Sequence, residues 1–150
     1  MAQRSKISDK VIVVADRGYE SYNVFAHIEK KDWNYVIRVK DACSNGMTST
    51  LELPDSDEYD VVVHRLLTRK NSKEVKANPQ IYRFIPSTLT FDFLEQNDDR
   101  VYPISFRVVR IKLDNGKYET LITNLDAETF PAEVLKQIYA LRWGIMPISA

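Results

Sequence analysis

The stretch of residues 11–19, Val-Ile-Val-Val-Ala-Asp-Arg-Gly-Tyr, decides how the rest of the sequence is interpreted. Its first five residues are apolar and rich in β-branched side chains, which is typical of a strand covered on both faces of a parallel sheet. The polar residues after them end the strand and place Asp16 at its carboxyl end. Open α/β sheets bind their ligands beyond the carboxyl ends of their strands, so Asp16 is a candidate functional residue. The spacing is also compatible with an aspartate that caps the next helix.

A helix and a second strand follow this stretch. Ser21 is a candidate N-cap, and apolar residues recur at helical spacing from there until the helix is expected to end near Asp32. Residues 35–39, Tyr-Val-Ile-Arg-Val, then have strand character again. The sequence therefore predicts one β-α-β unit with a right-handed crossover over residues 11–39.

Residues 41–123 predict an antiparallel, strand-rich insertion without helices. Strands are expected over residues 58–68, 80–85, 101–113 and 118–123. The apolar alternation of the third strand slips by one residue after Val108, which predicts a β-bulge. Asn115-Gly116 predicts a hairpin turn between the last two strands.

A late helix is expected after residues 124–126. Asp126 or Thr129 can cap it, Pro131 suits its first turn, and the apolar spacing continues to about Trp143 or Gly144. The predicted fold is thus α/β (α+β) in three parts: a strand-helix-strand unit (1–40), the insertion (41–123) and the late helix with its tail (124–150).

The composition excludes several classes of protein. The chain has 150 residues, 44% of them hydrophobic, with 21 basic and 21 acidic side chains, which predicts one globular domain and no disordered tail. No apolar run approaches the roughly 20 residues of a membrane-spanning helix. Zero net charge argues against a wholly basic nucleic-acid binder, so any contact with nucleic acid would be a local patch. A single cysteine and the lack of a signal-peptide pattern predict a cytoplasmic protein.

The best local patch for a phosphate backbone is the basic segment, residues 65–76. It has five basic side chains against one acidic one: Arg65, Arg69, Lys70, Lys73 and Lys76 against Glu74. The alternative is a solvated surface, in which the acidic segment at residues 52–60 neutralises it across a hairpin. Tyr139 and Arg142 share a face of the late helix, which suits gripping a phosphate, although an ordinary amphipathic helix would also carry them.

Four segments together, residues 11–19, 35–40, 119–125 and 139–145, resemble the bacterial insertion-sequence transposases of the DDE class. The group in question has a long β insertion and a signature of Tyr, two residues, Arg, three residues, Glu, six residues and Lys. The resemblance implies a ribonuclease-H-like core in which three carboxylates hold two magnesium ions for attack on a DNA phosphodiester. It further implies that Asp16 is a catalytic, magnesium-binding carboxylate, that Tyr139 and Arg142 open the signature, and that the insertion helps to handle the transposon end.

The sequence also departs from this pattern. Met146 stands where the signature has Glu, and the soft thioether of methionine is a poor ligand for magnesium. No strand with a first aspartate precedes residue 11. These departures predict a transposase fragment with a partial core that is inactive alone. The alternatives are a DNA-binding module without catalysis, or a remnant that self-associates through an exposed edge of the strand at residues 11–15.

Overall fold

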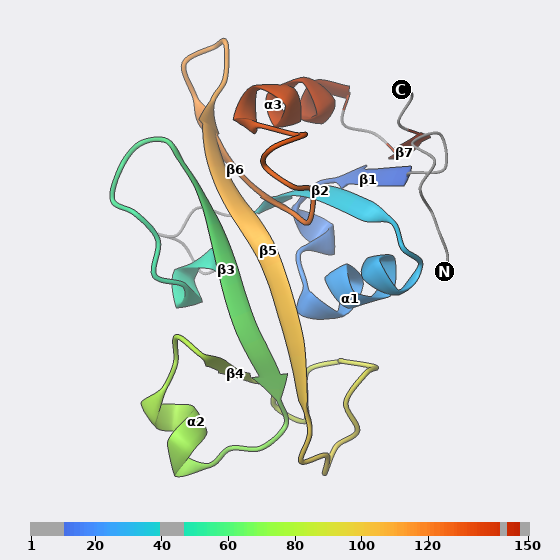
Figure 1. The fold of residues 1–150 in the computed structure, drawn as a ribbon, viewed down its shortest axis with the longest axis vertical. Helices are drawn as coiled ribbons and strands as arrows, with labels where there is room; N and C mark the ends of the chain where they lie inside the picture. Colours follow the sequence, from blue (N-terminus) through green and yellow to red (C-terminus); the bar gives the residue numbers. More distant parts are fainter. Residues whose placement is uncertain (1–10, 40–46, 142–143, 148–150) are drawn as a thin grey trace.

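The computed structural model describes residues 11–39 and 47–141, and the backbone of residues 144–147. One twisted sheet of seven strands, in the order β4-β3-β5-β6-β2-β1-β7, forms its centre (Figure 1). The strands are β1 (Val11–Ala15), β2 (Asn34–Val39), β3 (Tyr59–Thr68), β4 (Tyr82–Phe84), β5 (Val101–Lys112), β6 (Tyr118–Thr123) and β7 (Gly144–Pro147). The α-helices are α1 (Tyr22–Lys30), α2 (Lys73–Ala77) and α3 (Ala132–Leu141), and the 3-10 turns are η2 (Arg17–Tyr19) and η3 (Met47–Thr50).

The predicted β-α-β unit is confirmed. β1 and β2 pair in parallel, and α1 connects them. Ser21 is the N-cap of α1, because its hydroxyl oxygen accepts a hydrogen bond of 3.0 Å from the backbone N–H of Val24. Asp16 consequently follows the carboxyl end of a strand whose neighbour runs in the same direction.

The sheet has a hydrophobic core on each face, which confirms the mixed α/β class. α1 packs on one face, where Phe25 stacks on Tyr35 of β2 with ring centroids 4.7 Å apart. α3 packs on the other face and buries Leu135 and Ile138. Figure 1 shows the two helices on opposite sides of β1 and β2. A strand between two such layers is apolar on both faces, as β1 is.

The predicted β-bulge in β5 is wrong. β5 pairs residue by residue with β3 and β6 across the expected slip, with Val108 opposite Val61 and Ile122. The phase of the pattern changes because Phe106 and Val108 belong to the core under α1, whereas Val109 belongs to the core under α3. The slip therefore marks a change of the covered face and not an extra residue.

Two helices differ from the prediction. A short helix, α2, lies within the basic segment and is capped by Ser72, whose hydroxyl accepts from the N–H of Val75 at 3.2 Å. The described part of the late helix is Ala132–Leu141; the predicted end at Trp143 lies outside the described residues, and the alternative end, Gly144, belongs to a strand instead. The backbone of residues 144–147 then forms β7, which pairs antiparallel with β1.

The pairing with β7 corrects the expectation of an exposed edge at β1. β1 has β2 on one side and β7 on the other, so its backbone N–H and C=O groups are paired on both sides. Self-association of the chain stays a prediction without this edge to support it.

The strands of the predicted insertion belong to the same sheet as the β-α-β unit. β6 pairs with β5 on one side and with β2 on the other. The predicted Asn-Gly turn joins β5 to β6, and Gly116 adopts φ +87°, a conformation that favours glycine. The division at residues 40 and 123 stays a prediction.

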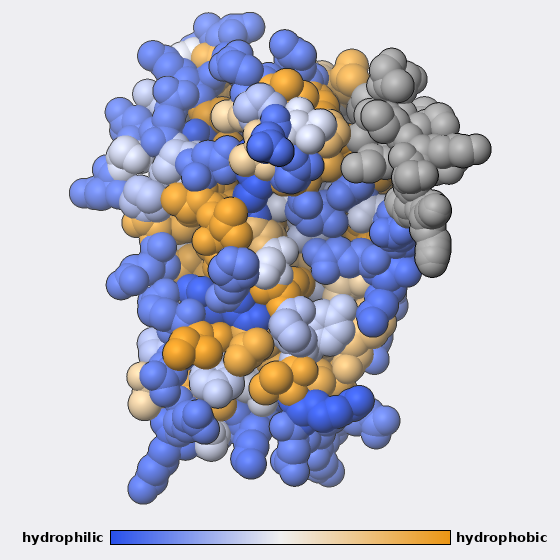
Figure 2. Space-filling model, in the orientation of Figure 1, coloured by the Kyte–Doolittle hydropathy of each residue, from blue (hydrophilic) through white to orange (hydrophobic). Residues whose placement is uncertain are grey.

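Among the described residues, no helix is long and apolar enough to cross a membrane. Figure 2 shows that hydrophilic side chains cover most of one face of the molecule, with separate apolar patches between them.

Candidate active site and nucleic-acid interface

Asp16 lies between β1 and the turn η2. Its backbone is extended, with φ −96° and ψ −176°, and its side chain forms no cap hydrogen bond to η2. α1 is capped by Ser21 instead. The Asp16 side chain therefore caps neither helical segment, although Asp16 occupies the N-cap position of η2, so the alternative of a carboxylate that serves as a helix cap is wrong.

Arg38 of β2 joins Asp16 to a second carboxylate. Its Nε lies 2.6 Å from Asp16 Oδ1, and its Nη1 donates to Glu119 Oε1 of β6 at 3.2 Å. The side chain of Asp16 is 40% exposed and that of Glu119 is 17% exposed. Two carboxylates with one guanidinium thus meet where β1 and β2 end and β6 begins.

Tyr139 of α3 belongs to the same cluster. Its side chain is buried, with 4% relative exposure. Burial opposes the charge of Arg38, but Tyr139, Glu119 and Asp16 outweigh it, so the pKa of Arg38 is raised and the guanidinium stays charged at neutral pH. The structure therefore brings Asp16 and Tyr139, which the sequence singled out separately, to one arginine. Arg142 lies outside the described residues.

Arg38 and Glu119 were not among the site residues predicted from the sequence. Arg38 is the one charged residue of β2, a strand whose other residues after Asn34 are all buried. A charge in such a strand needs a partner, so its presence was a signal. Glu119 carried no comparable signal, because it lies 81 positions from Arg38 in the sequence.

The cluster has the type of ligand atom that magnesium prefers. Carboxylate oxygens of Asp16 and Glu119 are hard donors, and magnesium is often held by one or two carboxylates together with substrate phosphates. Among residues 11–39 and 47–141, however, no group of three or more His, Cys, Asp or Glu side chains is placed to hold a metal ion. Arg38 also contacts Asp16 Oδ1 directly, so a cation would compete with the guanidinium for that oxygen.

The acidic and basic segments do not neutralise one another. Asp60 is the second residue of the long strand β3, whereas Arg69 follows its last residue. Figure 1 shows the two ends of β3 on opposite sides of the molecule, with α2 beside the basic end. Asp60 instead forms an ion pair of 2.6 Å with Arg107 of β5.

Within the basic segment the sequence predicts DNA contacts for Arg65, Arg69, Lys70 and Lys73, and the structure divides these four residues into two kinds. Arg69 is 9% exposed, and its guanidinium donates to backbone carbonyls of the loop at residues 85–94. Arg65 is also buried and donates to the carbonyl of His64 and to Gln80 Oε1. Lys70 and Lys73 are exposed. The geometry gives Arg69 a structural role and leaves the two lysines free to meet a phosphate.

Comparison with known proteins identifies the family. A model of the family described as "Transposase DDE domain" matches residues 2–145. No curated protein matches the sequence significantly. The matched range contains β1, the β-α-β unit, the long antiparallel strands and α3. Because the match covers nearly the whole sequence, the chain belongs to the transposase DDE domain family.

Proposed function

We propose that this chain is part of the catalytic domain of an insertion-sequence DDE transposase and that Asp16 is one of its metal-binding carboxylates. The observation that carries the proposal is the position of Asp16 at the carboxyl end of β1, beside Arg38, Glu119 and Tyr139. The family match supports it, since such transposases usually use a divalent metal. The finer assignment, to the group with a β insertion and a Tyr-Arg-Glu-Lys signature, rests on the sequence resemblance.

The residues around Arg38 would prepare the site for a divalent cation. Arg38 fixes the Asp16 carboxylate at the end of β1 and balances part of the negative charge of the two acids. When bound, a divalent cation supplies Lewis-acid polarisation of the phosphate and activation of the attacking hydroxyl group. Asp16 and Glu119 are the described residues that would hold it, and Tyr139 fixes α3 against the same cluster.

We further propose that the chain does not cut DNA alone. At position 146, where the signature has Glu, this chain has Met, and the backbone there pairs with Ile12 as part of β7. A strand at this point does not present a carboxylate from α3 toward Asp16. The chain would then act in the cytoplasm as a DNA-binding part of a transposase. Its contribution to the catalytic site would be limited to Asp16 and its neighbours.

The expected result of a nicking assay is therefore negative. Supercoiled plasmid incubated with the purified chain and Mg²⁺ should stay uncut, both for the wild-type chain and for Asp16→Ala, because Met146 stands in place of one of the three carboxylates that the reaction needs. Glu128→Ala, which removes an exposed carboxylate in the loop before α3, is the matched control. Magnesium-dependent nicking by the wild type and Glu128→Ala, abolished in Asp16→Ala, would overturn the proposed inactivity.

Metal binding by Asp16 has a readout that is independent of cutting. Paramagnetic Mn²⁺ should broaden the NMR signals of β1, η2 and the start of β6 in the wild-type chain. Asp16→Ala should remove this broadening, while Glu128→Ala should leave it unchanged. Equal broadening in all three proteins would contradict Asp16 as a metal ligand.

A further inference from the structure

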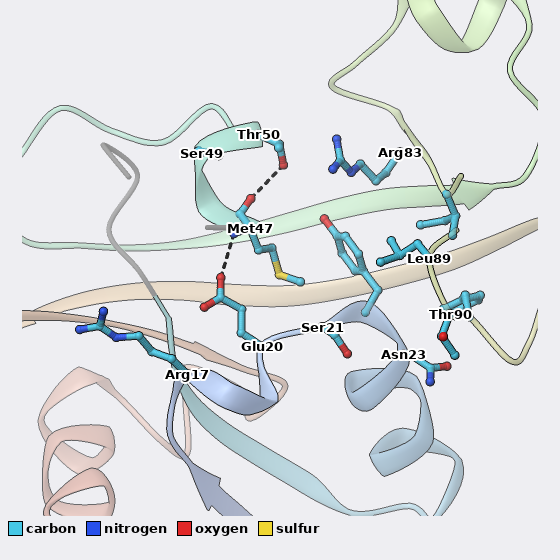
Figure 3. A pocket seen from close by; sticks show the side chains of 13 residues that line it. Arg17, Glu20, Ser21, Asn23, Met47, Ser49, Thr50, Arg83, Leu89 and Thr90 are labelled. Atoms are coloured by element: carbon cyan, nitrogen blue, oxygen red, sulfur yellow. Dashed lines mark hydrogen bonds between the residues drawn. The ribbon is translucent and has the colours of Figure 1, made fainter. Parts of the chain in front are cut away.

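A groove lined by both apolar and basic side chains lies on the face of the sheet that carries α1. It consists of two cavities, of about 430 and 350 Å³, that share Tyr22, Thr50 and Arg83 as a common wall. The first cavity lies between the η2 turn, the start of α1 and the loop at residues 85–91 (Figure 3). The second continues from the common wall to α2 and the basic segment. We call the two cavities together the α1 groove.

Four basic side chains line the α1 groove without a carboxylate partner among the described residues. Arg17 and Arg83 line the first cavity, and Arg65, Arg83 and Lys76 line the second. Arg65 donates only to neutral oxygens, those of His64 and Gln80. The sequence predicts a basic patch from residues 65–76 alone. The structure adds Arg17 and Arg83, which come from distant segments of the chain.

The α1 groove has little negative charge to balance these cations. Glu20 is the acidic residue that lines the described part of the groove, and its carboxylate accepts a hydrogen bond of 2.8 Å from the backbone N–H of Met47 (Figure 3). Burial raises the pKa of Tyr22 on the common wall, and Arg83 and Arg65 oppose that shift. The hydroxyl of Tyr22 thus experiences the positive potential of both arginines.

The far wall of the groove is held in place by contacts to α1. Asn23 donates to Asp92 Oδ2 at 3.2 Å and accepts from the Asp92 backbone N–H at 2.9 Å. His27 Nε2 lies 2.7 Å from the same carboxylate oxygen, and this hydrogen bond lowers the pKa of Asp92. The loop beside Leu89 and Phe91 is therefore tied to the helix, so the cavity is formed before any ligand arrives.

We infer that the α1 groove binds the sugar–phosphate backbone of one DNA strand. Arginine side chains match phosphate oxygens in charge and geometry, and arginines that line a cavity with no carboxylate partner among the described residues are suited to bind them. Cavities of several hundred Å³ accommodate a ligand of small-molecule size, which for DNA means a few nucleotides of a single strand and not a duplex. The inference rests on the proposed function, because it takes DNA as the partner, and it names where the DNA lies.

The α1 groove lies between two parts of the molecule that were predicted as separate sites, the surroundings of Asp16 and the basic segment. Arg17 directly follows Asp16 on the turn η2, and Lys76 belongs to α2 at the far end of β3. A DNA strand lying in the groove would run from the basic segment toward the turn η2, which directly follows Asp16. The groove therefore explains how DNA bound at α2 is delivered to the end of β1.

The test is the binding of a fluorescent single-stranded oligonucleotide, measured by anisotropy as a function of salt. Arg83→Gln and Lys76→Gln remove one charge each from the groove, and Lys117→Gln removes one charge from the exposed hairpin between β5 and β6. Each groove variant should weaken binding about five-fold to ten-fold, and the slope of log K against log salt should decrease by about 0.7 per lost phosphate contact. Lys117→Gln should change affinity less than two-fold and leave the slope unchanged.

The outcomes separate this inference from the proposed function. Equal effects of the groove variants and of Lys117→Gln would overturn the groove while DNA binding by the chain stands. No binding of any DNA by the wild type at low salt would overturn both. A duplex that binds more tightly than the single strand and loses affinity in Arg83→Gln would also overturn the single-strand assignment. Lys76 is exposed, so its variant keeps the test valid should Arg83→Gln fail to fold.

Discussion

Replacing Arg69 by Ala should lower the free energy of unfolding by about 3 kcal/mol or more. The guanidinium of Arg69 is buried and donates to five backbone carbonyls, those of Ile85, Pro86, Leu89, Phe91 and Leu94. The shortest of these hydrogen bonds, to Pro86, is 2.7 Å. Buried carbonyls that lose their donor each cost a desolvation penalty of about 1–3 kcal/mol, reduced where water enters.

Urea denaturation followed by circular dichroism measures this loss. Lys70→Ala is the matched control, because it removes the neighbouring positive charge from an exposed side chain and should change stability by less than about 0.5 kcal/mol. Arg69→Lys should be nearly as destabilising as Arg69→Ala, since an ammonium group has three donors on one atom and cannot reach carbonyls spread around a planar guanidinium. An effect of Arg69→Ala as small as that of Lys70→Ala would contradict the structural role.

The result bears on function as well as on stability. The loop that Arg69 holds supplies Ile85, Leu89 and Phe91 to the wall of the α1 groove. A loss of DNA affinity in an Arg69 variant would therefore report a collapsed wall, not a lost phosphate contact. Charge reversal at Lys70 and Lys73 tests DNA binding without removing a buried contact, because both side chains are exposed.

The parts of the fold that depend on neighbouring residues could be predicted from the sequence. The β-branched run of β1, the Ser21 cap and the Asn-Gly turn each act through contacts within a few residues, and all three have the expected structure. The position of Asp16 followed from them, because a strand that ends in a β-α-β unit fixes where the next residue lies.

The errors arose where distant segments decide the structure. The slip after Val108 could mean a bulge or a change of covered face, and only the positions of α1 and α3 distinguish the two. The cluster around Arg38 joins β1, β2, β6 and α3, which no local pattern relates.

Arg107 is expected to be the second residue on which the fold depends strongly. Its side chain is 4% exposed, and it forms a two-pronged ion pair with Asp60 of β3, with distances of 3.0 and 2.6 Å. Its Nη1 also donates to the carbonyls of Leu125 and Phe130, at 2.8 and 3.0 Å, in the segment that leads into α3. Arg107→Ala should therefore lower the free energy of unfolding by about 3–5 kcal/mol, as expected when one partner of a buried ion pair is removed.

The same contacts predict which part of the molecule responds to a change at Arg107. Because Arg107 fixes the residues before α3, its loss should disturb the packing of Tyr139 beside Arg38 before it affects the core under α1. Arg110→Ala is the matched control: Arg110 lies on the same strand, donates to the carbonyl of Asp57 and lies 4.6 Å from the centroid of the Tyr118 ring, in a more exposed position. Hydrogen exchange should show faster exchange in α3 for Arg107→Ala and no change for Arg110→Ala. Faster exchange in α1 with α3 unaffected would contradict Arg107 as the residue that places α3 against the candidate site.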